Sequence, residues 1–227
     1  MASDIRSASV EIAVEPDRRL DLFNGTDLSG WSVDDSFDNP DGPPLFRVEG
    51  GCLVTTKDTY GHLVSDRSYR NYLLEIEYRL PETGGNGSIL LHVSKLRTLR
   101  TGSENHFPQS IEIKLRTNDA GDIYCIRENI AVADMERLRP REPGQKWGGD
   151  EEDARHIVKL QNAENPAGAW NRMVIRVADK TIRIWLNGTL VADAFDCTTD
   201  QGRISVQAGG DEVVFRAVRL HPLDADL

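Results

Sequence analysis

Apolar and polar side chains alternate with a period of two along most of the chain from Phe46 onward. In YLLEIEYRL (72–80), Leu74, Ile76 and Tyr78 alternate with charged residues. This period places successive side chains on opposite faces of a β-strand. The pattern therefore predicts strands with one face buried and one face open.

Further segments with the same alternation are separated by short clusters of Gly, Asn, Asp and Pro, which are typical of turns. These segments are 88–94, 110–116, 121–127, 171–195, 202–209 and 212–223. Asn187-Gly188 is the strongest hairpin signal in the chain. Roughly a dozen strands are expected and a regular helix nowhere, which predicts an all-β sandwich or jelly roll.

Two segments depart from this pattern. Residues 1–20 are expected to be an N-terminal lead-in or an edge strand, before a single domain over 21–227. Residues 128–165 are highly charged, have Pro and Gly breaks and show little periodicity. We expect a long charged loop insertion here, and such loops are usually functional or disordered.

The composition narrows the choice of partners. The chain has 227 residues and a formal net charge of −10, which disfavours nucleic acid and anionic membranes as partners. The three cysteines are widely spaced and odd in number, so we expect small, reduced, buried side chains. No apolar run is long enough to span a membrane. The first twenty residues lack the features of a signal peptide, which predicts a cytoplasmic protein; export with a signal already removed is the alternative.

The segment SIEIKLR (110–116) carries an acid and two bases on one face. Ile111 and Ile113 point one way, and Glu112 and Lys114 point the other way. The charged face is either an ion pair on solvated surface or the floor of a site. The alternation alone permits both interpretations.

Five phrases in the same order resemble the 3-keto-disaccharide hydrolase domain family. They are LFNGTDLSGW (22–31), GGNGSILLHV (84–93), PQSIEIKL with AGDIYCI (108–126), the segment 164–191 and the segment 202–220. The resemblance implies a concanavalin A-like jelly roll of two antiparallel sheets, and a carbohydrate as the ligand. It also places Glu112 on the concave side. Where this chain has His92 and Lys114 the family often has Arg and Gln, so substrate or mechanism can differ.

Members of the family include enzymes that cleave sugars oxidised to a ketone at C3. The ketone acidifies the hydrogen on C2, and loss of that proton can expel the C1 substituent. This route needs a base, a donor for the enolate oxygen and an acid for the leaving oxygen. The resemblance implies Glu112 and His92 as base and acid and Lys114 as the enolate donor. Ordinary two-carboxylate hydrolysis is less favoured, because SIEIKL offers one carboxylate.

Four further residues are candidates for binding the sugar: Ser88, Tyr124, Gln207 and Trp147. Ser88 follows a glycine turn, Tyr124 could stack on a sugar or fill the core, and Trp147 lies in the charged insertion. His106 and His156 flank the expected site and could approach the substrate.

No compact cluster of metal ligands is readable, and no organic cofactor is expected; a divalent metal stays an open alternative. The leading hypothesis is an enzyme that cleaves a 3-keto-glycoside by elimination or hydrolysis. The alternative is a non-catalytic, lectin-like carbohydrate-binding domain. The charged strand and insertion favour the enzyme.

Overall fold

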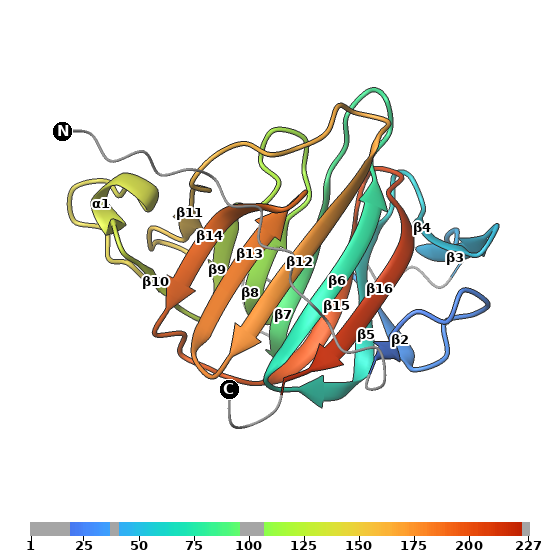
Figure 1. Ribbon diagram of the computed structural model, residues 1–227, viewed down its shortest axis with the longest axis horizontal. Coiled ribbons are helices and arrows are strands. Elements are labelled where there is room, and N and C mark those ends of the chain that lie inside the picture. Colours follow the sequence, from blue (N-terminus) through green and yellow to red (C-terminus); the bar gives the residue numbers. More distant parts are fainter. Residues whose placement is uncertain (1–18, 37–40, 96–106, 224–227) are drawn as a thin grey trace.

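The computed structural model describes residues 19–36, 41–95 and 107–223, and the N-terminal prediction for residues 1–18 lies outside these ranges. Two antiparallel sheets pack face to face (Figure 1). The seven-stranded sheet has the order β11 (His156–Ile157), β9 (Ile123–Ile126), β8 (Gln109–Lys114), β7 (Gly87–Lys95), β15 (Gly202–Gly209), β5 (Tyr60–Tyr69) and β2 (Trp31–Asp35).

The second sheet has nine strands. Its order is β10 (Ala131–Val132), β14 (Thr189–Phe195), β13 (Thr181–Leu186), β12 (Trp170–Ala178), β6 (Tyr72–Arg79), β16 (Val214–Pro222), β4 (Cys52–Thr55) and β3 (Phe46–Glu49), and β1 (Leu20–Asp21) pairs with β16. This arrangement confirms the predicted all-β jelly-roll class. Within residues 19–36, 41–95 and 107–223, no helix has the length and apolar character that a membrane span requires.

The core lies between the two sheets and follows the predicted alternation. Leu74, Ile76 and Tyr78 from β6 are fully buried there, and Ile111 and Ile113 from β8 meet them from the other sheet. The alternate residues of each strand therefore point away from the core. The expected hairpin at Asn187-Gly188 joins β13 to β14, and both residues have positive φ, as a type I′ turn requires.

The insertion at 128–165 contains β10, β11 and the short helix α1 (Met135–Leu138). A fully buried arginine, Arg139, organises it. Its guanidinium donates to the carbonyl oxygens of Ala154, Ile130 and Gly148 and to the side-chain oxygen of Asn129, at 2.6–2.8 Å. The last part of the insertion adds β11 to the edge of the seven-stranded sheet beside β9.

Candidate active site

The outer face of the seven-stranded sheet, the face turned away from the core, carries most of the predicted site residues. Its strand register aligns five polar side chains in a row across β2, β5, β15, β7 and β8. The members of this polar row are Asp34, His62, Gln207, Ser88 and Lys114. Four of them are buried, and Lys114 is partly exposed.

Glu112 lies at one end of the polar row, on the same strand as Lys114, and is 2% exposed. Its Oε1 accepts hydrogen bonds from Ser88 Oγ and from Lys114 Nζ, each at 2.7 Å. A buried carboxylate requires such donors, because removal from water disfavours an unpaired charge. Oε2 is the oxygen that neither Ser88 nor Lys114 holds.

Tyr124 on β9 is the cross-strand partner of Glu112, and His156 on β11 is the partner of Tyr124. The His156 ring stacks on Tyr124 with 4.5 Å between centroids, and Lys114 Nζ lies 4.9 Å from the Tyr124 centroid. Because β9 lies between β8 and β11, these contacts approach Tyr124 from opposite sides. The phenol therefore offers a substrate its hydroxyl more readily than a free ring face. Burial, together with the charges of Glu112 and Asp122, raises the pKa of Tyr124, so this hydroxyl is a donor near neutral pH.

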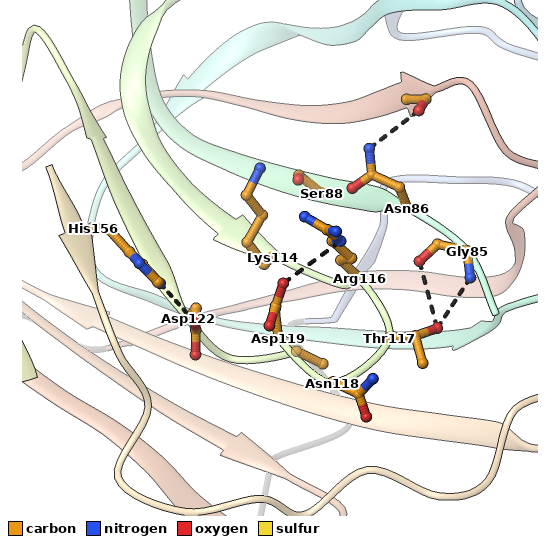
Figure 2. A network of polar contacts seen from close by, with 12 residues as sticks. Gly85, Asn86, Ser88, Lys114, Arg116, Thr117, Asn118, Asp119, Asp122 and His156 are labelled. Atoms are coloured by element: carbon orange, nitrogen blue, oxygen red, sulfur yellow. Dashed lines mark hydrogen bonds and ion pairs between the residues drawn. The ribbon is translucent and has the colours of Figure 1, made fainter. Parts of the chain in front are cut away.

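A shallow depression adjoins the polar row. Its lining includes Asn86, Arg116 and Gly209, which lie two residues along the chain from Ser88, Lys114 and Gln207. Figure 2 shows Arg116 and Asn86 beside Ser88 and Lys114. Asn86 donates to the carbonyl oxygen of Gly209 at 3.1 Å, which ties the two strands together at this end. The depression gives a polar ligand a solvent-open approach to the row.

His92 is placed differently from the other predicted residues. It lies in an irregular stretch of β7, has a φ of 56° and is fully buried. Neither ring nitrogen has a hydrogen-bond partner of good geometry among the described residues. Burial lowers the pKa of His92 to about 4, and the charge of Asp200 and the nearby backbone of Gln201 offset only part of that effect. The imidazole is therefore neutral near pH 7.

Trp147 belongs to the insertion's own packing. Its indole N–H donates to the carbonyl oxygen of Arg139 at 2.9 Å, and the guanidinium of Arg141 lies 3.8 Å from its ring. No contact between Trp147 and Glu112 is found in the described part of the chain. His106 lies outside the described residues.

Asp34, His62 and Asp122 were not predicted as site residues. Two of them have a signal in the sequence, since the period of two places His62 opposite the core residue Leu63, and Asp122 on the same face as Tyr124. These three residues join the predicted site residues on one face only through the order of the strands in the sheet, and the alternation does not predict that order. Across residues 19–36, 41–95 and 107–223, no three His, Cys, Asp or Glu side chains are grouped closely enough to hold a metal ion.

Comparison with known proteins agrees with this architecture. A family model described as the 3-keto-α-glucoside-1,2-lyase-like domain matches residues 19–221. No curated protein sequence matches the chain significantly.

Several solved structures share the fold. A "putative glycosyl hydrolase" from Parabacteroides distasonis is 20% identical, with a TM-score of 0.60 over 91% of this chain and 94% of that one. The carbohydrate-binding module CBM66 from Bacillus subtilis is 12% identical, with a TM-score of 0.52 over 84% and 94%. A Bacillus subtilis protein with a galectin-like fold is 14% identical, with a TM-score of 0.53 over 89% and 94%. At these identities the likeness concerns the fold.

Proposed function

Because the chain belongs to the family of 3-keto-α-glucoside-1,2-lyase-like domains, we propose that it cleaves 3-keto-glycosides, with Glu112 as the base that removes the C2 proton. The observation that carries this proposal is the environment of Glu112. A solvated surface ion pair would leave its carboxylate exposed, whereas this one is buried and held through a single oxygen by Ser88 and Lys114. Such a carboxylate is fixed in position for proton transfer.

The reaction proceeds in two balanced steps. Glu112 Oε2 takes the proton from C2, and the C–H electron pair moves into a C2–C3 double bond as the C3 ketone becomes an enolate. The enolate then collapses, a C1–C2 double bond forms, and the C1–O bond breaks with its electrons on the leaving oxygen. Subsequent addition of water to the double bond would complete a net hydrolysis.

Lys114 and Tyr124 are the proposed donors to the enolate oxygen. Lys114 has three N–H donors, of which one is directed to Glu112, and Tyr124 retains its hydroxyl proton near neutral pH. Donors aimed at a developing negative charge are often the largest catalytic contribution. Ser88 and Gln207 are the proposed contacts for sugar hydroxyls, since in the polar row Ser88 lies next to Lys114 and Gln207 lies next to Ser88.

His92 is a weak candidate for the acid of this reaction. Because its pKa is about 4, His92 is a neutral imidazole near pH 7 and lacks the second ring proton that an imidazolium acid would donate. It also has no contact with Glu112 in the described part of the chain. The proposed reaction therefore assigns no step to His92.

A second candidate function is carbohydrate binding without turnover. A carbohydrate-binding module shares the fold, and the same polar row could hold a glycan through hydroxyl contacts. Buried charges at Glu112 and Lys114 favour the enzyme, because a lectin-like site gains little from a carboxylate fixed by two donors.

Turnover of 3-keto-glycosides beside the matching unoxidised glycosides tests the proposal. The wild-type protein should release aglycone only from the keto sugars, and Glu112→Gln should lower kcat by at least about 10²-fold. Glu77→Gln is the matched control, since Glu77 forms its ion pair with Arg216 on the other sheet. Each assay is run with and without a chelator. Glycan binding by both proteins with no turnover would replace the enzyme by the lectin-like function.

A further inference from the structure

The insertion brings a histidine and an aspartate to the same outer face as Glu112. His156 projects from β11, with its neighbour Ile157 in the core, so the imidazole lies on the outer face. Its Nε2 lies 2.7 Å from Oδ2 of Asp122, and its side chain is 39% exposed. Figure 2 shows the pair on one side of Lys114, with Ser88 on the other.

Asp122 is fixed independently of His156. Its side chain is 4% exposed, and Oδ1 accepts a hydrogen bond of 3.0 Å from the backbone N–H of Lys159. Lys159 Nζ also lies 3.7 Å from Oδ1. Since an ionised carboxylate can only accept, the hydrogen bond to Asp122 requires the proton of the neutral imidazole on Nε2. Nδ1 is then the nitrogen that can gain and release a proton.

The register sets the distance between this pair and Glu112. Glu112, Tyr124 and His156 are successive cross-strand partners, and adjacent strands lie about 4.8 Å apart. The α-carbons of Glu112 and His156 are thus separated by about 10 Å, with both side chains on one face. A pyranose that lies over Tyr124 on this face can present C2 to one group and the C1 oxygen to the other.

We propose that His156 is the general acid that protonates the leaving C1 oxygen, and that Asp122 is the residue that positions it. This inference rests on the proposed function and supplies the step left unassigned there. The Nδ1–H bond breaks, its proton joins the leaving oxygen as the C1–O electrons arrive, and the imidazole becomes neutral. The Asp122 carboxylate accepts the Nε2–H hydrogen bond and keeps the ring oriented before and after the transfer.

Other titratable and charged groups lie near His156 as well. Tyr124 stacks against it, Lys114 lies beyond Tyr124, and Lys159 contacts the far oxygen of Asp122. The imidazole is therefore held between the Tyr124 ring and the Asp122 carboxylate.

The test compares leaving groups. An acid matters most for a poor leaving group, so His156→Gln should lower kcat/KM about 10²-fold or more for a methyl 3-keto-glucoside. For a 4-nitrophenyl 3-keto-glucoside, whose leaving group needs little protonation, the loss should be less than about 10-fold. The basic limb of the wild-type pH profile should disappear in His156→Gln, and Asp122→Asn should lower kcat/KM more for the methyl than for the 4-nitrophenyl substrate, because the imidazole loses the acceptor that orients it.

The outcomes separate this inference from the proposed function. Equal losses on both substrates, or unchanged pH profiles, would give His156 a structural role and overturn the inference while the enzyme stands. Full activity of His156→Gln on the methyl glycoside would do the same. No turnover by the wild type would overturn the proposed function and this inference with it.

Discussion

Ser88 donates a hydrogen bond of 2.7 Å to Oε1 of Glu112 across the β7–β8 pair, and both side chains are almost completely buried. Lys114 binds the same oxygen from two residues along β8. The carboxylate is therefore held from two directions, and its second oxygen faces neither donor. This asymmetry is what a base with one working oxygen requires.

Ser88→Ala should loosen that carboxylate while leaving its charge and its partner Lys114 in place. A hydrogen bond to a charged group contributes about 1.5–3 kcal/mol, so we expect a loss of that order in the free energy of unfolding. On 3-keto-glycosides, kcat should fall about 10-fold with a smaller change in KM. Urea unfolding and steady-state kinetics measure the two effects.

Ser110→Ala is the control for this change. Ser110 is also buried, on the same face of β8, but its hydroxyl donates to the carbonyl oxygen of Pro108. It should cost some stability and leave kcat unchanged. Equal kinetic losses in the two variants would mean that the Ser88 contact has no particular role in catalysis.

His92 should make the protein sensitive to mild acid. Its pKa is about 4 in the folded protein and about 6.5 when exposed, so between these values the unfolded chain takes up a proton that the folded protein refuses. Stability from this source is complete above pH 6.5 and decreases as the pH falls toward 4. Between pH 7 and pH 5 the loss should be about 2 kcal/mol.

His92→Asn removes the titrating group and tolerates the positive φ at this position, since asparagine adopts that conformation more readily than most residues. Urea unfolding at pH 7, 6 and 5 should then show a smaller pH dependence in the variant than in the wild type. Parallel curves for the two proteins would place the acid sensitivity in other groups.

The alternation of the sequence predicted the fold and part of the site. It placed Glu112 and Lys114 together on the face opposite Ile111 and Ile113, because the period of two in a strand leaves no other choice. The alternation did not distinguish a solvated surface from a ligand-binding site on this face. That distinction depended on Ser88, which meets Glu112 only through the pairing of β7 with β8.

The insertion was the segment least accessible to sequence reasoning. Its weak periodicity predicted a loop, and a two-residue strand such as β11 is too short to give a period. Its pairing with β9 brings His156 onto Tyr124, whereas Trp147, the aromatic that the sequence favoured, packs within the insertion. Contacts of this kind arise from tertiary packing, which local patterns do not encode.

Replacing Gln207 should leave the stability of the protein equal or higher but weaken substrate binding. Its Oε1 is buried and has no hydrogen-bond partner in the described structure, which costs stability unless a ligand supplies a donor. Gln207→Leu has a similar volume and removes the unsatisfied group. We expect unfolding free energy to stay equal or rise by about 1 kcal/mol, and KM for the 3-keto-glycoside to rise about 10-fold. A destabilised variant with unchanged KM would make Gln207 a purely structural residue.

Arg139 should control the site indirectly, through the insertion that carries His156. All four of its hydrogen bonds are donated to neutral oxygens. One of these acceptors is the carbonyl oxygen of Ala154, a residue two positions before His156 in the chain. Arg139→Lys keeps the charge but cannot reproduce the planar fork, so several carbonyls lose their donor. We expect a loss of about 3 kcal/mol or more in unfolding free energy.

In the Arg139→Lys protein that remains folded, activity on the methyl glycoside should fall more than activity on the 4-nitrophenyl glycoside. Arg183→Lys, at an exposed ion pair with Asp193, should change neither quantity appreciably. If Arg139→Lys lost stability with equal losses on both substrates, the insertion would support the fold without orienting His156.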